Sequence, residues 1–362
     1  MTIDTGRYIF PIDTLKVDQP WHVGNVVIYP GSELPGLIAS APARGGAGGS
    51  YQKSVDEMVS ACRDRSVAVV RAGNLESVDD ALDAVRTALD ILRLFQSGRS
   101  RARTTWFSLP GELYQANIEY LATGATTAVG QMFRGKYSGW SFGSESHREW
   151  LASAGYQFLS NAAANPTANE ACRRAILSVR LFSRAAAEHR PDLKIVGIVG
   201  AMEALLVDHT QSGGKSFALA RYVAWFTCHL PDQPACGRDQ EMCAAVFIRP
   251  EKFKRLKVLR QLGNSSKYWQ CHQWRSVCDW YDNRSLAAHG DDPHGVGIGP
   301  GDQAEYHFSH YLIEPVLAWF AAHLIDPIGD LQRDIDSRPS PSAWTAVIAA
   351  MDRGDLVPPW VN

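Results

Sequence analysis

The chain has 362 residues, of which 36 are Lys or Arg and 38 are Asp or Glu, so its formal net charge is -2 at neutral pH. Hydrophobic residues make up 45% and charged residues 20%, which is the composition of a globular protein with a packed core and excludes a disordered or fibrous chain. The near balance of charge also excludes a uniformly basic surface, so any site for a polyanion must be local.

The first part of the chain, residues 1–143, predicts a mixed α/β domain. Short β-rich runs between Gly- and Pro-rich breaks predict strands at 7–10, 23–29, 66–71 and 104–109. From Ser77 to Phe95, apolar residues recur at three- and four-residue spacing, with Ser77 as the N-cap and Asp80 in the first turn. This pattern predicts an amphipathic helix that packs on the sheet.

The second part, residues 144–336, predicts an all-α bundle. Helical periodicity predicts helices at 145–160, 169–189, 194–208, 215–229, 251–262, 268–289 and 302–325. Proline-containing breaks separate them, and loops of this length favour antiparallel neighbours. Residues 337–362 contain several prolines and are expected to form a surface tail. The predicted fold class is therefore α+β, with a mixed α/β domain followed by a helical bundle.

Three features of the sequence predict the compartment. The longest apolar stretch, residues 195–207, is interrupted by Glu203 and is shorter than the ~20 residues of a membrane span, so no span is expected. The first fifteen residues lack a basic head followed by an apolar run, so we expect no secretory signal and a cytoplasmic protein. Seven cysteines without a C-x-x-C pair fit reduced thiols better than a disulfide framework.

Two isolated charges fall on apolar helix faces. The helix at 194–208 is apolar on every side except at Glu203, which places that carboxylate inside the protein. Arg284 lies on the apolar stripe of the helix at 268–289 that is formed by Val277, Trp280, Tyr281 and Ala288. A buried guanidinium without an anion would cost several kcal/mol, so Arg284 requires one. Glu203 is the candidate within the protein, which would make a structural ion pair, and a bound phosphate is the other.

A histidine follows Arg284 at the end of the same helix. His289 precedes Gly290, the residue type that usually ends a helix, and the helix dipole favours a cation there. Such a histidine can titrate near neutral pH, as an acid-base catalyst must. Residues five apart on an ideal helix are separated by roughly 140°. Arg284 and His289 therefore converge only if the last turn is loosened, or if a second copy of the helix faces the first across a two-fold axis.

The segment 281–290, Tyr-Asp-Asn-Arg-Ser-Leu-Ala-Ala-His-Gly, resembles the R-x4-H motif of HEPN (higher eukaryotes and prokaryotes nucleotide-binding) domains of the Apea-like branch. Upstream, residues 201–206, Ala-Met-Glu-Ala-Leu-Leu, resemble the A-x-E-A-L-L-like helix of that branch. Residues 220–224, Ala-Arg-Tyr-Val-Ala, approximate its R-x-A-like core. The resemblance covers roughly residues 192–324.

The resemblance implies a helical bundle that forms a homodimer in which the motifs of two chains face each other. Many members are metal-independent RNA endonucleases, whereas others bind nucleotides or RNA without cleaving. His289 would move a proton to or from a ribose 2′-hydroxyl or the leaving 5′-oxygen, and Arg284 would stabilise the phosphorane, which yields a 2′,3′-cyclic phosphate. The residues expected to support them are Glu203, Ser285, Asn283 and Tyr281.

Ser285 departs from the Asn, Asp or His that often follows the arginine in active members, although its hydroxyl can bind a phosphate. The expected partner is RNA, and neither a cofactor nor a metal is expected. The physiological role implied is that of a toxin or defence effector, with an antitoxin or a regulatory protein as a possible further partner.

Three further patterns have two interpretations each. The predicted helix at 251–262 carries cations that form either a solvated face or an RNA-backbone track, namely Lys252, Lys254, Arg255 and Lys257. Residues 213–216, Gly-Gly-Lys-Ser, resemble the end of a P-loop, but His209 stands where the leading glycine is required, which favours a helix–helix turn. A metal site could be formed by His289, His294, His307 and His310 with Asp291 and Asp292. The H-x2-H spacing of His307 and His310 lacks the i, i+4 register of zinc-binding helices, so no metal site is predicted.

Overall fold

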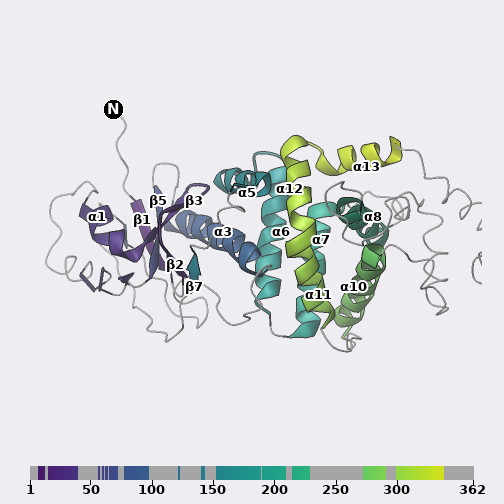
Figure 1. The fold of residues 1–362 in the computed structure, drawn as a ribbon, viewed down its shortest axis with the longest axis horizontal. Coiled ribbons are helices and arrows are strands. Elements are labelled where there is room, and N and C mark those ends of the chain that lie inside the picture. The colour runs from purple at the N-terminus through teal and green to yellow at the C-terminus, as the bar shows by residue number, and fades with distance from the viewer. Residues whose placement is uncertain are drawn as a thin grey trace, which may run out of the picture. The chain divides into compact units, whose positions relative to one another are not determined.

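The structure, a computed structural model, describes residues 7–12, 15–39, 56–57, 59–60, 62–63, 65–71, 77–97, 121–122, 140–142, 152–188, 190–208, 214–228, 272–290 and 299–337. They belong to two compact units, residues 1–168 and 169–362. Figure 1 shows the strands of the first unit in purple to teal and the helices of the second unit in teal, green and yellow, because the colour follows the chain. The fold is α+β, because the first unit contains strands and helices, whereas the described elements of the second unit are all helical.

The first unit contains a small antiparallel sheet. Its strands are β1 (Arg7–Ile12), β3 (Trp21–Val23), β4 (Val26–Pro30), β5 (Ser66–Arg71) and β6 (Leu121–Ala122), in the spatial order β3-β4-β5-β1-β6. Two further strands, β2 (Leu15–Val17) and β7 (Trp140–Phe142), form a separate parallel pair. The predicted strand at 66–71 is confirmed as β5, and the one predicted at 104–109 lies outside the described residues.

The single strand predicted at 23–29 is wrong, because the chain reverses within it. Gly24 has a φ of 59°, which glycine adopts readily, and Val23 pairs with Val26 across a two-residue turn. The result is the β3–β4 hairpin. The turn is held by α5 (Ala154–Ala164), where the Ser160 hydroxyl accepts the Gly24 N–H at 3.0 Å.

The helices of the first unit cover this sheet. They are the short helices η1 (Gly31–Glu33) and α1 (Leu34–Ala39), followed by α3 (Val78–Ser97) and α5. Helix α3 confirms the helix predicted from Ser77 onward. Its first turn is a reciprocal cap, in which Ser77 Oγ accepts the Asp80 N–H at 3.2 Å and Asp80 Oδ2 accepts the Ser77 N–H at 3.0 Å.

Helix α5 belongs to the first unit. Its N-cap is Ser153, and the Tyr156 hydroxyl donates to the His22 carbonyl of β3 at 2.5 Å. The sequence places the boundary between the domains at 143/144, whereas the compact units divide at 168/169. The physical reason for this difference is that α5 is bonded to the β3–β4 hairpin.

The second unit contains eight described helical segments. They are α6 (Glu170–Ala186), α7 (Pro191–Leu206), α8 (Lys215–Cys228), α10 (His272–Ala288), α11 (Pro300–His307), the π-helical turn η6 (Phe308–Leu312), α12 (Ile313–Ala322) and α13 (Pro327–Ser337). The predicted helices at 169–189, 194–208, 215–229 and 268–289 match α6, α7, α8 and α10 to within a few residues. The helix predicted at 251–262 lies outside the described residues.

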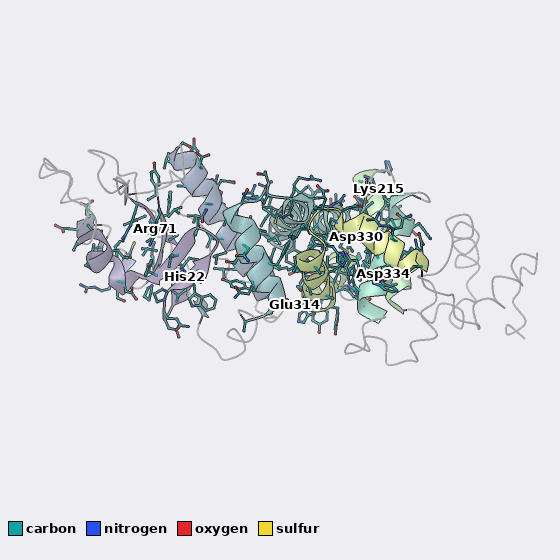
Figure 2. The ribbon with its side chains drawn as sticks, turned by 90° about the horizontal axis from the view of Figure 1, so that it is seen from above. His22, Arg71, Lys215, Glu314, Asp330 and Asp334 are labelled. Carbon is teal, nitrogen blue, oxygen red and sulfur yellow. The ribbon has the colours of Figure 1, made fainter. Side chains whose placement is uncertain are left out.

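The helix predicted at 302–325 is composed of three segments, α11, η6 and α12, with a π-helical turn between two α-helical parts. Helix α13, which carries Asp330 and Asp334 in Figure 2, was not predicted as a separate helix. None of the helices in the described ranges is both long and apolar enough to cross a membrane on its own.

Helices α6 and α7 pack closely, and this contact fixes the part of α7 that carries Glu203. A Cβ on Gly197 would lie 2.5 Å from the Ala185 Cβ, so glycine permits the close approach of the two helices. The Ser178 hydroxyl donates to the Ala201 carbonyl at 2.7 Å. Arg174 Nη1 donates to the Val207 carbonyl at 2.9 Å and so satisfies an acceptor at the end of α7.

Glu170, the first residue of α6, contacts Arg174, which binds the end of α7. We expect Glu170→Gln to lower the melting temperature by a few degrees near neutral pH. Its carboxylate accepts from Arg173 and, at 2.7 Å, from Arg174 Nε. The Arg173 hydrogen bond is the largest cause that lowers the pKa of Glu170. Both partners partly face solvent, so the contribution is on the order of 1 kcal/mol or less.

A carboxyl group whose pKa is lower in the folded state stabilises the protein above its unfolded pKa, and the contribution disappears as the pH falls through the folded pKa. The difference in melting temperature between wild type and Glu170→Gln should therefore close as the pH falls from about 6 to below about 4. Thermal melts of both proteins and of the exposed control Glu33→Gln measure this. A difference that is independent of pH would contradict it.

Candidate functional site

The candidate site lies on α10, which packs against α7, α8 and α11. Val277 and Trp280 are buried in the core, with 0% and 4% of their surface exposed. Ala288 is exposed, so the expectation that the apolar stripe continues to it is wrong. The inward face of α10 ends before its last turn, and Arg284 lies at this transition from core to solvent.

Arg284 and Glu203 are in contact. Arg284 Nη2 lies 3.5 Å from Glu203 Oε2, and the two side chains are 29% and 12% exposed. This distance is long for a charge-assisted hydrogen bond, which typically measures about 2.7–2.9 Å. Within the described part of the chain, the buried atoms Glu203 Oε1 and Arg284 Nε have no hydrogen-bond partner. The pair therefore leaves the guanidinium with unused donors.

Tyr281 is the third member of this cluster. The guanidinium carbon of Arg284 lies 5.4 Å from the centre of the Tyr281 ring, within the range of a cation–π interaction. Burial, reinforced by the negative charge of Glu203, raises the pKa of Tyr281, so the phenol is neutral at physiological pH. The ring thus supports the guanidinium from one side while Glu203 contacts it from α7.

Asn283 and Ser285 flank Arg284 and are both half-buried. Asn283 Nδ2 donates to the Asp279 carbonyl of the preceding turn at 2.8 Å, and its Oδ1 has no hydrogen-bond partner among the described residues. The Ser285 carbonyl accepts the His289 N–H at 3.2 Å. Asn283 is therefore held by its own helix. The backbone of Ser285, next to Arg284, is hydrogen-bonded to the backbone of His289.

His289 lies in the turn that follows α10, with its side chain exposed. Its N–H also donates to the Leu286 carbonyl, and the Gly290 N–H donates to the Ala287 carbonyl, so the last turn is tightened rather than loosened. Gly290 has a φ of 87° and ends the helix. His289 is not among the contacts of Arg284 in the described residues. One chain thus brings Glu203, Tyr281 and Arg284 together and leaves the histidine in solvent.

The other predicted site residues are distributed as follows. The cations Lys252, Lys254, Arg255 and Lys257 lie outside the described residues. Lys215, labelled in Figure 2, begins α8. It is followed by Ser216 and preceded by Gly214, which has a φ of 83°. His307 is buried and its ring lies 5.0 Å from that of Trp280, a contact that the sequence did not predict. In the ranges that the structure describes, no three His, Cys, Asp or Glu side chains gather as metal ligands would.

The arrangement combines two chemical capacities on one helix. A half-buried guanidinium with unused donors can bind an oxyanion, and an exposed imidazole is a group of the type that serves as a general acid or base. The chain matches no protein-family model, no curated protein and no solved structure.

Proposed function

We propose that the chain is a metal-independent RNA endonuclease of the HEPN type that acts as a toxin or defence effector. The observation that supports this most directly is the incomplete Arg284–Glu203 pair on a helix that ends at an exposed histidine. The single long contact to Glu203 holds the guanidinium in place without using all of its donors. A phosphodiester would supply the missing acceptors.

In the proposed reaction, His289 accepts the proton of a ribose 2′-hydroxyl while the 2′-oxygen attacks the adjacent phosphorus. Arg284 stabilises the charge of the phosphorane. The bond from phosphorus to the 5′-oxygen then breaks, and the imidazolium of His289 returns its proton to that oxygen. The products are a 2′,3′-cyclic phosphate and a 5′-hydroxyl, with neither metal nor cofactor involved.

The proposed active form is a homodimer. On one chain the arginine faces α7 and the histidine faces solvent, so a second copy of α10 across a two-fold axis would bring an imidazole to each guanidinium. The cations Lys252, Lys254, Arg255 and Lys257 would contact the RNA backbone, which gives binding a strong dependence on salt.

The experiment that tests the proposal is incubation of the purified protein with mixed cellular RNAs in EDTA. We expect RNA fragments to accumulate, and a DNA of matched sequence to stay intact because it lacks the 2′-hydroxyl. Intact RNA under these conditions would contradict the proposal.

A second candidate function is a non-catalytic module that binds nucleotides or RNA. Two observations favour it: Glu203 already contacts the guanidinium, and Ser285 stands where many active members have Asn, Asp or His. Calorimetric titration with nucleotides and short RNAs distinguishes the two functions. Heat of binding without strand scission would favour the binding module.

A further inference from the structure

A cluster of aromatic side chains on α11 and η6 reaches the surface. Tyr306, at the end of α11, is 51% exposed. The His310 ring lies 3.9 Å from the Tyr306 ring at an angle of 30°, and the Tyr311 ring lies 5.8 Å away in an edge-on arrangement. The Tyr306 ring thus rests against the imidazole in a tilted contact and is still half exposed, so it offers planar surface to a ligand.

The backbone holds these rings in place. In the π-helical turn η6, the Ile313 N–H donates to the Phe308 carbonyl five residues earlier. His310 Nδ1 lies 3.1 Å from the Tyr306 carbonyl, and Ser309 Oγ donates to the Glu305 carbonyl at 2.8 Å. Single π-helical turns within α-helices are frequent at functional sites. The contact of the His310 ring with the Tyr306 carbonyl thus holds the imidazole beside the Tyr306 ring.

The cluster is continuous with the helix that carries Arg284. The buried His307 ring lies 5.0 Å from the Trp280 ring of α10 and 5.6 Å from the Tyr311 ring. Trp280 and Arg284 are four residues apart and share a face of α10. Ring contacts thus run from the arginine-bearing face of α10 to the exposed Tyr306.

Two carboxylates of α11 share one lysine, which compensates half of their charge. Lys194 of α7 contacts Asp302 at 2.7 Å and Glu305 at 2.5 Å, and all three side chains are at most 30% exposed. These two carboxylates would otherwise repel the phosphates of a nucleic acid. The shared lysine lowers their combined charge from -2 to -1, which weakens this repulsion without removing it.

We propose that the Tyr306–His310 pair is a stacking platform for a nucleobase of single-stranded RNA. The inference rests on the proposed function and adds to it a binding site for the base, separate from the phosphate site at Arg284. A base stacks on an aromatic side chain irrespective of its identity, so the platform favours unpaired segments over duplexes and is tolerant of sequence.

The test is the affinity of the full-length protein for a fluorescent 2′-O-methyl oligonucleotide, which cannot be cleaved through its 2′-oxygen. Tyr306→Ala should weaken binding by about five- to 150-fold, the range for loss of one stacked base, whereas Tyr306→Phe should bind as wild type does. Ile325→Ala, at a position 86% exposed, is the matched control and should change nothing. An oligonucleotide with abasic positions should bind wild type as weakly as the intact one binds Tyr306→Ala.

Equal affinities of wild type and Tyr306→Ala, with RNA cleavage intact, would overturn the platform and leave the nuclease standing. A loss of affinity in Tyr306→Ala, with RNA uncleaved in EDTA, would establish the platform and overturn the nuclease. Absence of any binding to the oligonucleotide would overturn the platform as well.

Discussion

We expect His289→Ala to lower the rate of the proposed RNA cleavage by roughly 10²–10⁴-fold, the contribution of a positioned acid-base group, and to leave the melting temperature at the wild-type value. The side chain is exposed and follows the end of α10, so its removal disturbs no packing. Arg284→Ala should lower cleavage by roughly 10²–10³-fold through loss of phosphorane stabilisation. Initial rates with a defined single-stranded RNA in EDTA measure both effects.

The controls separate catalysis from stability. His22→Ala removes an exposed histidine in the first unit, labelled in Figure 2, and should retain full activity. If the Glu203–Arg284 pair were purely structural, Glu203→Gln and Arg284→Gln would lower the melting temperature equally and His289→Gln would change nothing. Wild-type cleavage by His289→Ala would contradict the assigned role of the imidazole.

Phe308→Ala lowers the free energy of unfolding of the second unit by ~3–5 kcal/mol, because it removes a large side chain from a site that cannot collapse fully. Phe308 begins the π-helical turn and is 0% exposed. Its ring stacks on that of Phe182 of α6, with ring centres 4.7 Å apart and planes at 19°. A loss of this size corresponds to roughly 10 °C in melting temperature.

Calorimetric melts of Phe308→Ala, Phe308→Leu and Ile325→Ala measure this effect. The leucine variant fills part of the space and should lie between the alanine variant and wild type. Ile325→Ala alters an exposed position and should stay within ~0.5 kcal/mol of wild type. If Phe308→Ala melted together with wild type, Phe308 would not pack against Phe182 of α6 as described.

Local sequence signals predicted the elements whose pattern is complete within one segment. Helix α3 is an example, since its cap and its apolar spacing both lie between Ser77 and Phe95. The mostly inward position of Glu203 on α7, with its side chain 12% exposed, follows for the same reason, because the residues around it in the helix are apolar on all sides. These features need no knowledge of the rest of the chain.

Features that depend on distant partners were not predictable in this way. The Gly24 turn is held by a hydrogen bond to Ser160, 136 residues later. The same bond attaches α5 to the first unit. The π-helical turn conserves the apolar pattern of a long helix, so periodicity alone does not reveal it. Helix α13 does show a signal, since Ile328, Leu331 and Ile335 are buried at helical spacing.

In the candidate site, too, the features set by the local sequence were predictable, whereas those that depend on packing were not. The apolar context indicated that Arg284 requires an anion, and the contact with Glu203 provides one. The support from the Tyr281 ring depends on the rotamers of two side chains on adjacent turns, which residue spacing does not specify. The path from Trp280 through His307 to the surface depends on the packing of α10 against α11.

The most direct test of the account is the chemical nature of the ends that the purified protein leaves on a short single-stranded RNA in EDTA, determined by mass spectrometry. Attack by the 2′-oxygen, with His289 moving the proton and Arg284 stabilising the phosphorane, predicts 2′,3′-cyclic phosphate and 5′-hydroxyl ends. Ends bearing a 3′-hydroxyl and a 5′-phosphate, formed only when a divalent cation is restored, would contradict it.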